Sequence, residues 1–242
     1  MTAREAARAE WKKLKNRPLK EKLIHIGTYY WPHILAVTVL LVVAVSLISS
    51  AVNSKDSAFQ AYLLSAAEID EGSSFEQDFA DWAGIDTDEF ETTITTSVYS
   101  VSDGGDLSTT DSQLITVWTA SETLDVLAGD TENILNYAYN DFLRDLREIL
   151  TTEQLENWAD HLLYIDQAVC DAIDSGTDTV YTLPDPANPG EMEQPIPVLL
   201  SIPESSRLWE SYEFLGEDPV VGIIGNAPNP DHAIAFLEYI LP

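Results

Sequence analysis

Aromatic side chains are the residues of this sequence best suited to holding a solute. Tryptophan rings stack on the faces of sugar rings, and they also pack readily in a protein core. Trp118 comes shortly before the apolar segment LDVLAGD (124–130), so we expect it to line a cleft if any tryptophan does. Packing between a helix and the sheet is the alternative for each of the four tryptophans in the long acidic part of the chain, which are Trp82, Trp118, Trp158 and Trp209.

Two polar residues stand at the ends of predicted strands. Asp130 directly follows the strand predicted at 123–129, and Asn226 directly follows the strand predicted at 219–225. Open α/β sheets place their ligands beyond the carboxyl ends of strands. We therefore predict a ligand-binding site made of Trp118, Asp130 and Asn226. The alternatives are that Asp130 only caps a helix and that Asn226 only shapes a turn.

The sequence offers little for catalysis or for a metal. His161 and His232 are the only histidines after residue 53, and no Ser/His/Asp or zinc-type spacing occurs. The acidic segment at 86–93 begins like a calcium loop but has Glu91 where the loop needs glycine. Cys170 is predicted to be a small buried hydrophobe, with a reactive thiol as the alternative. We predict no enzyme, no metal and no cofactor.

Short apolar strands alternate with amphipathic helices after residue 55, which predicts an α/β fold with a mixed, at least partly parallel sheet. The segment at 111–121 has strand-forming residues, but its apolar spacing and Asp111 as a cap favour a helix. The predicted strands are 58–66, 90–101, 123–129, 164–172, 197–202 and 219–225, and the predicted helices are 73–84, 111–121, 130–143, one capped at Thr151 or Thr152, 205–215 and one beginning at Pro230. A proline-rich loop or hairpin is predicted at 182–197.

Charge divides the chain into two environments. Residues 1–32 contain eight Lys or Arg against three acidic residues, a formal charge of +5. Residues 54–242 contain four basic residues against 38 acidic ones, a formal charge of −34. Nucleic acid requires a basic patch, so the acidic part is not predicted to bind it.

An uncharged segment of membrane length joins the two environments. Ile34 to Val52 contains 19 residues without a charge, Pro or Gly, and as a helix it would span about 28 Å. Tyr29, Tyr30 and Trp31 precede it, where aromatic rings favour the headgroup layer. The basic side should be cytoplasmic. These features predict a basic cytoplasmic arm (1–32), a transmembrane helix (33–53) and an acidic extracytoplasmic α/β domain (56–242).

A cleaved signal peptide is the rival interpretation of the apolar segment. Ser49-Ser50-Ala51 has the small residues of a cleavage site. The charged region before the apolar run is over 30 residues long, however, and the run itself exceeds the roughly 7–15 residues of a signal-peptide core. These two lengths favour an uncleaved anchor in the cell membrane.

The end of the chain carries a resemblance to a known family. VVGIIGNAPNPDHAIAFLEYIL has a strand with a Gly and an Asn, a loop with Pro and an acidic residue, and a helix with an A-x-x-F-L pattern. This order resembles the closing unit of extracellular solute-binding proteins of the sugar- and iron-binding type. LDVLAGD and NYAYNDFLRDLREILTTEQL resemble further elements of the same proteins.

The N-terminal half is similar to a narrower group. PLKEKLIHIGTYYWPHILAVTVLL resembles the anchor of uncharacterised single-pass membrane proteins of clostridia-like bacteria, which carry a reduced periplasmic-binding-protein-like (type 2-like) domain. A typical solute-binding protein has two lobes and is nearly twice as long as the acidic part of this chain. The resemblance therefore implies a trimmed version of that fold.

Two functions follow from these observations. The first is a membrane-anchored module that captures a small solute of the sugar or peptide class for a transporter or sensor. The second is a protein-interaction or scaffold domain that keeps the fold without the ligand, with a membrane protein as partner. The first predicts a cleft lined by Trp118, Asp130 and Asn226, and the second predicts these residues buried or scattered beside an apolar patch.

Overall fold

The fold is seen in a computed structural model, which describes residues 55–70, 72–98, 109–176 and 183–241. The chain divides into two units at Ser54, and the described residues all belong to the unit Lys55–Pro242. Its strands are β1 (Asp56–Leu64), β2 (Ala66–Glu68), β3 (Phe90–Ser97), β4 (Val126–Asp130), β5 (Leu162–Asp166), β6 (Pro195–Ser201), β7 (Tyr212–Phe214) and β8 (Pro219–Ile223). Its helices are α4 (Phe75–Ala83), α5 (Thr109–Ala120), α6 (Thr131–Ala138), α7 (Thr152–Asn157), α8 (Gln167–Asp174), α9 (Leu208–Ser211) and α10 (Pro230–Ile240), with 3-10 turns at Leu146–Glu148 and Pro189–Glu191.

Six strands form one mixed sheet in the order β3-β1-β4-β8-β6-β5. The pairs of β1 with β3 and with β4 are parallel, and the other three pairs are antiparallel. Every residue of the central strands β4 and β8 is buried, as expected of strands covered on both faces. The predicted mixed, partly parallel α/β sheet is therefore confirmed.

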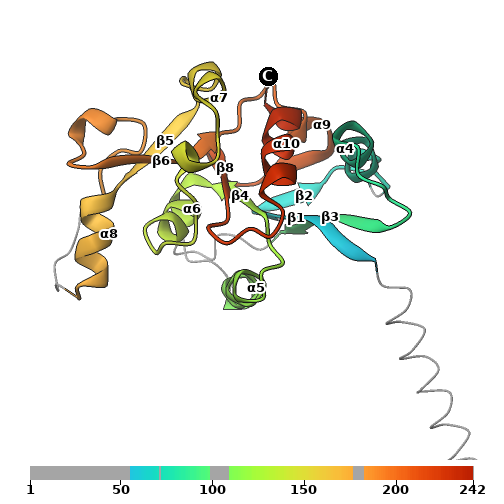
Figure 1. The fold of residues 1–242 in the computed structure, drawn as a ribbon, viewed down its shortest axis with the longest axis horizontal. Coiled ribbons are helices and arrows are strands. Elements are labelled where there is room, and N and C mark those ends of the chain that lie inside the picture. The colour runs from blue at the N-terminus through green and yellow to red at the C-terminus, as the bar shows by residue number, and fades with distance from the viewer. Residues whose placement is uncertain (1–54, 71, 99–108, 177–182, 242) are drawn as a thin grey trace, which may run out of the picture. The chain divides into compact units, whose positions relative to one another are not determined.

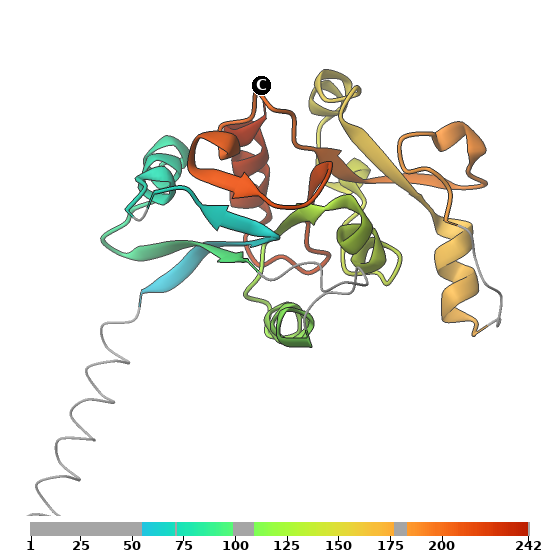
Figure 2. The same ribbon diagram turned by 180° about the vertical axis from the view of Figure 1, so that it is seen from behind.

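Helices cover both faces of this sheet. Figures 1 and 2 show α10 and α5 on opposite sides of it. On the α10 side, Phe59 of β1 packs against Phe79 of α4 and Phe236 of α10, with ring centroids 4.9 Å apart in each case. On the α5 side, Tyr62 packs edge-on against Trp118 at 5.2 Å. Phe59 and Tyr62 point to opposite faces because side chains alternate along a strand.

The closing unit of the chain forms as the sequence predicts. β8 ends at Ile223, and α10 begins at Pro230, whose missing N–H costs nothing in the first helical turn. The predicted face of this helix, which includes Ala233 and Phe236, is buried. The buried carboxylate of Asp125 fixes the loop before α10, because it accepts hydrogen bonds from the backbone N–H of Asn229 (2.7 Å) and Gln60 (2.9 Å).

Other local predictions are also confirmed. The ambiguous segment at 111–121 is the helix α5, α4 ends at Gly84 in the left-handed conformation (φ 71°), and Thr151 caps α7 with a reciprocal bond to Gln154. Asp111 is not the cap of α5, because that helix already includes Thr109. Its carboxylate instead accepts a bond from the Tyr62 hydroxyl at 2.6 Å.

Three predicted elements are wrong in extent. The helix predicted at 130–143 ends at Ala138, and Leu143 then forms a bridge with Ile224, directly after β8. The strand predicted at 164–172 ends at Asp166, whose side chain accepts from the Ala168 N–H and so begins α8. The helix predicted at 205–215 is short, because residues 212–214 pair with β2 in a separate two-stranded sheet. In each case a long-range contact or a cap outweighs local propensity.

The predicted membrane segment lies outside the described residues. The arm at 1–32, the span at 33–53 and their residues Tyr29, Tyr30, Trp31, Ile34 and Val52 all fall within residues 1–54. Among residues 55–70, 72–98, 109–176 and 183–241, no helix has the length and hydropathy needed to cross a bilayer. The membrane anchor therefore stays a prediction of the sequence.

Candidate functional site

Asp130 serves the fold at the end of β4. Its side chain is 8% exposed and caps α6 by accepting from the backbone N–H of Asn133 at 3.0 Å. It also accepts from the Asn133 amide and from the Ser65 hydroxyl at 3.0 Å. Gly216 lies so close that a Cβ there would be 2.6 Å from the Asp130 Cβ. The predicted ligand role of Asp130 is therefore not supported, and the helix-cap alternative is confirmed.

Asn226 lies at the opposite edge of the sheet from Asp130. β8 runs antiparallel to β4, with Asp130 paired to Pro219 and Val126 paired to Ile223. Asn226 follows the end of β8 and so stands beyond the beginning of β4. One length of β4 separates the two residues, roughly 13 Å for four residue steps. The prediction that Asp130 and Asn226 share a site is wrong, because it assumed that both strands point the same way.

Trp118 packs on the body of the domain. It is half-buried in the last turn of α5, with its ring edge-on against Tyr62. Its neighbour Thr119 accepts a hydrogen bond from the Asn226 side-chain amide at 2.8 Å. Trp118 itself does not line the hollow described below. The packing alternative is therefore the one that the structure supports.

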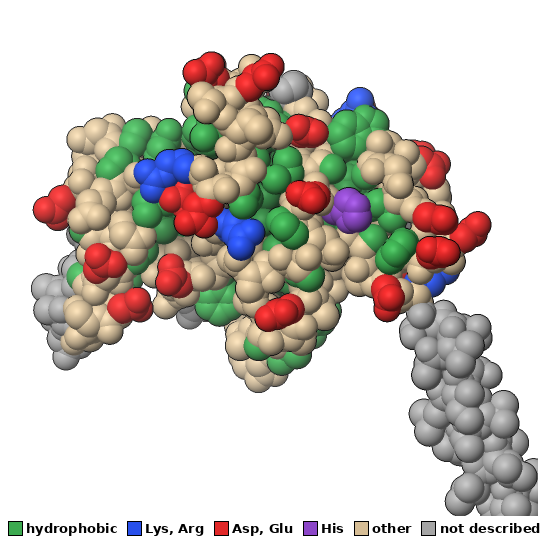
Figure 3. Space-filling model, viewed as in Figure 1, with side chains coloured by type: hydrophobic (Ala, Val, Ile, Leu, Met, Phe, Trp, Pro, Cys, Tyr) green, Lys and Arg blue, Asp and Glu red, His purple; other side chains and the backbone are tan. Residues whose placement is uncertain are grey.

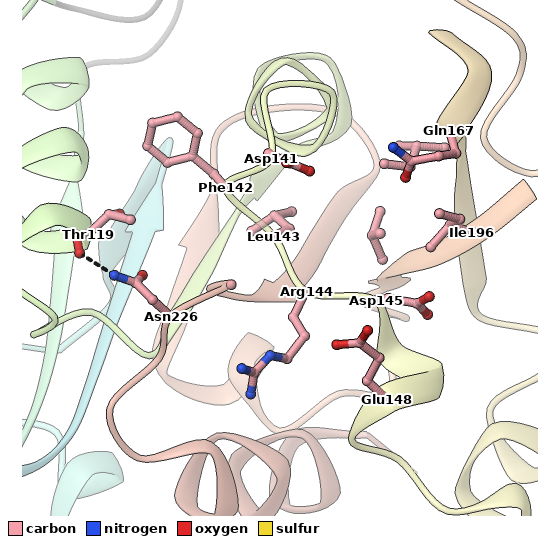
Figure 4. Close-up of a pocket in the computed structure, with 13 residues that line it drawn as sticks. Thr119, Asp141, Phe142, Leu143, Arg144, Asp145, Glu148, Gln167, Ile196 and Asn226 are labelled. Atoms are coloured by element: carbon pink, nitrogen blue, oxygen red, sulfur yellow. Dashed lines mark hydrogen bonds between the residues drawn. The ribbon is translucent and has the colours of Figure 1, made fainter. Parts of the chain in front are cut away.

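An open hollow of about 580 Å³ lies at the Asn226 edge of the sheet (Figure 4). The turn after α6, the end of α5, the loop after β8 and the strands β5 and β6 all contribute to its wall. Its lining residues are Thr119, Asp141, Phe142, Leu143, Arg144, Asp145, Glu148, Ile165, Gln167, Ile196, Val198, Gly225 and Asn226. We define this set as the Arg144 hollow. Asn226 is the one member of the predicted ligand site that lines it.

The turn after α6 is fixed by contacts with β8. Asp141 adopts a left-handed backbone (φ 64°), and Leu143 then forms a bridge with Ile224. The backbone N–H of Arg144 donates to the Ile223 carbonyl at 2.8 Å. Gly222 lies beneath this turn, where a Cβ would be 2.9 Å from Leu143 Cδ1. These contacts hold the Arg144 backbone at the edge of the sheet.

The hollow contains Arg144, which has no ion pair among the described residues, and several carboxylates. Arg147 donates to both oxygens of Asp145, from Nε to Oδ1 at 3.0 Å and from Nη2 to Oδ2 at 2.6 Å. Arg144 is half-buried and has no ion pair or side-chain hydrogen bond with any described residue. Asp141 and Glu148 are exposed and likewise have no ion pair within the described part of the chain. Figure 3 shows basic side chains near the middle of this face among exposed hydrophobic and acidic ones.

Asp125 and Asp166 are buried near the same edge of the sheet, and their pKa values are shifted in opposite directions. Burial raises the pKa of Asp125 above its ordinary value, and the backbone N–H groups of Gln60 and Asn229 oppose that rise. Burial would also raise the pKa of Asp166. The backbone N–H groups that donate to Asp166, including Glu193 at 2.7 Å, outweigh that effect and lower its pKa below the ordinary value.

Catalytic and metal-binding options are few among the described residues. They contain no group of three His, Cys, Asp or Glu arranged to hold a metal ion. Cys170 is buried, and burial raises the pKa of its thiol to about 11, so the thiol is protonated at neutral pH. The His161 ring contacts the Ser201 hydroxyl at 3.0 Å, a pairing that the sequence spacing did not reveal. No described residue forms the hydrogen bond that would orient His161 as a base, so the pair resembles a cross-strand contact more than a triad.

Sequence reasoning missed the turn that supplies Arg144. The segment NDFLRDLRE was assigned to the end of a helix and beyond it, and its arginines were given no role. A signal was present, because residues 54–242 contain only four basic residues and Arg144 and Arg147 are two of them. In a strongly acidic domain, such a rare arginine is a candidate for binding an anionic group.

Comparison of the chain with known protein families, with curated proteins and with solved structures finds no match. The resemblance to solute-binding proteins therefore stays a prediction from the motifs.

Proposed function

We propose that this protein is a single-pass membrane protein whose acidic domain, outside the cell membrane, binds a small solute of the sugar or peptide class. Residues 1–32 form the cytoplasmic arm, residues 33–53 cross the membrane, and residues 56–242 form a reduced binding-protein-like domain. The domain acts as an accessory to transport or sensing. The charge change from +5 to −34 across an uncharged segment supports this arrangement.

The Arg144 hollow is the observation that carries the binding proposal. Its volume of about 580 Å³ falls within the roughly 300–1,000 Å³ of small-molecule sites. Its wall combines apolar side chains, such as Ile165 and Val198, with a larger number of polar and charged ones, such as Arg144 and Glu148. The closing unit of β8 and α10, which forms as the family motif predicts, supports the reduced binding-protein-like fold.

Thermal unfolding of the full chain in detergent tests the binding proposal. The panel contains sugars, amino acids, oligopeptides and divalent cations. A solute present at 100 times its dissociation constant should add about 2.7 kcal/mol to the free energy of unfolding. For a domain of this size that is a rise of roughly 5–10 °C in the melting temperature. A panel without any shift, on a chain that unfolds cooperatively, would contradict the proposal.

Cell fractionation tests the anchor separately. The full chain should sediment with membranes and resist extraction by high salt, because a buried apolar helix is not held by charge. A chain that begins at residue 56 should be released into the soluble fraction. Protease added outside the cell should digest the acidic domain and spare the basic arm. Digestion of the arm instead would contradict the proposed orientation.

The scaffold function is the second candidate. Trp118, Asp130 and Asn226 do not converge on one cleft, as that function predicts. Several large apolar side chains are exposed, including Trp82 (48%), Leu215 (52%) and Val117 (60%). Two results together would favour this function over the first. No solute of the panel would raise the melting temperature, and a membrane protein would co-purify with the wild type but not with Trp82→Ala.

A further inference from the structure

We propose that the Arg144 hollow binds a zwitterionic solute of the amino-acid or short-peptide class. Its carboxylate lies on Arg144, and its ammonium group lies between Asp141 and Glu148. This inference rests on the proposed solute-binding function and chooses between the two solute classes named there.

Arg144 provides the carboxylate end of the site. A guanidinium group has five N–H donors in a planar fork that matches a carboxylate. Arg147, three residues away, uses such a fork on the two oxygens of Asp145, whereas the guanidinium of Arg144 has no partner among the described residues. In Figure 4 the Arg144 side chain extends between Asn226 and Glu148. The described residues leave the donors of this half-buried cation unfilled, so Arg144 favours an anionic group from a ligand in a domain of charge −34.

Thr119 and Asn226 line the same hollow and are bonded to each other. The Thr119 hydroxyl oxygen is buried and has no hydrogen-bond partner among the described residues. The Thr119 carbonyl is occupied by the Asn226 amide, which fixes the two residues together (Figure 4). The Asn226 amide and the Thr119 carbonyl therefore form a fixed polar part of the wall.

The carboxylates of the hollow require a positive group on the solute. Asp141 and Glu148 both line the hollow and have no ion pair within the described residues. A solute with only a carboxylate would be attracted by the Arg144 guanidinium but repelled by the carboxylates of Asp141 and Glu148, since like charges at close range are costly. An ammonium group on the same solute reverses that repulsion. The two signs of charge in one hollow therefore fit a zwitterion.

The remaining wall favours a peptide-class solute over a sugar. Sugars stack on aromatic faces, and Phe142 is the one aromatic residue among those that line the hollow. Its ring packs edge-on against Tyr137 with centroids 5.2 Å apart. Apolar side chains of β5 and β6, including Ile165, Ile196 and Val198, form one side of it. Such a surface suits the apolar side chain of an amino acid.

Isothermal titration of the full chain in detergent tests the inference. The probes are L-leucine and L-alanyl-L-leucine with free termini, the N-acetyl and C-amide derivatives of the dipeptide, and maltose. We expect a free-termini probe to bind, and each blocked derivative to bind roughly 10- to 100-fold more weakly, because one charged hydrogen-bonding group is lost in each. Maltose should not bind.

Variants assign the two ends of the solute. Arg144→Gln should weaken binding of the dipeptide about 10- to 100-fold. The variant should then bind the dipeptide and its C-amide equally well. Glu148→Gln and Asp141→Asn together should remove the discrimination against the N-acetyl form. Arg207→Gln is the matched control, because it removes the same charge from an exposed residue that stacks on Tyr239 and does not line the hollow. Thermal unfolding without solute checks that each variant is folded.

The outcomes separate this inference from the proposed function. Equal binding of the blocked and free dipeptides, or binding of maltose alone, would overturn the zwitterion inference and leave the solute-binding function standing. Binding that survives Arg144→Gln unchanged would overturn the assignment of the carboxylate. No binding by any probe or by any solute of the wider panel, on a folded chain, would overturn both.

Discussion

Asp130 and Arg144 lie at opposite edges of the central sheet, and their polar groups differ in how far the protein itself satisfies them. At the edge where β4 ends, Asp130 is buried and its oxygens are filled by Ser65 and Asn133. At the edge where β4 begins, Arg144 stands in an open hollow with its donors unfilled by the described residues. A charged group whose hydrogen bonds are all made within the protein stabilises the fold. A charged group with hydrogen-bonding capacity left over at a hollow is available to a ligand.

We call the edge with Asp130 the closed edge and the edge with Arg144 the open edge. Substitution at the closed edge should reduce the free energy of unfolding more than substitution at the open edge. Asp130→Ala removes the cap of α6 and leaves the Asn133 and Ser65 donors unpaired in a buried place. We expect a loss of about 2–4 kcal/mol in the free energy of unfolding, measured by urea denaturation. Asp130→Asn keeps one acceptor and should lose less. If Asp130→Ala abolished solute binding while the unfolding free energy stayed unchanged, the contrast between the two edges would be wrong.

The turn that presents Arg144 should depend on Gly222. A Cβ at this position would lie 2.9 Å from both Leu143 Cδ1 and Leu199 Cδ2, and 3.1 Å from the Val198 carbonyl oxygen. Gly222→Ala should therefore cost about 1–3 kcal/mol of unfolding free energy, since overpacking forces side chains apart. Gly190→Ala is the control, because its nearest atom is 3.5 Å away, and it should change stability by under about 0.5 kcal/mol. Equal effects of the two substitutions would refute this account of the turn.

Asp125 and Asp166 should give opposite pH dependence. The raised pKa of Asp125 means that the folded chain holds its proton more tightly than the unfolded chain. The wild type should therefore gain stability relative to Asp125→Asn as the pH falls through the window directly above the ordinary carboxyl value of 3.8. The lowered pKa of Asp166 has the reverse sign, so the wild type should lose stability relative to Asp166→Asn as the pH falls below that value. Urea denaturation from pH 3 to 7 measures both differences, and equal signs would contradict the assignment.

Local sequence signals predict much of the secondary structure. The β8–α10 unit is marked by a short apolar run, two prolines and a helical apolar spacing, all within the last two dozen residues. The caps at Asp130 and Thr151 are similarly local, because each side chain bonds to a residue three positions on. Such features need no knowledge of distant partners.

Strand direction is the part that the sequence does not reveal. Whether β8 runs parallel or antiparallel to β4 is decided by pairing between segments about 90 residues apart. That single choice moves Asn226 from the Asp130 edge to the Arg144 edge. The end of α6 is hidden for the same reason, because Leu143 leaves the helical pattern to pair with Ile224. The candidate site is therefore visible only in the folded chain.

Hydrogen–deuterium exchange of the full chain, with and without the panel solute that raises its melting temperature most, tests the central claim directly. The open edge should be the ligand site, so the solute should slow exchange at residues 139–148 and 224–227. Exchange at 64–66, 130–133 and 214–218, which form the closed edge, should stay unchanged. Protection at the closed edge, without protection around Arg144, would contradict the account.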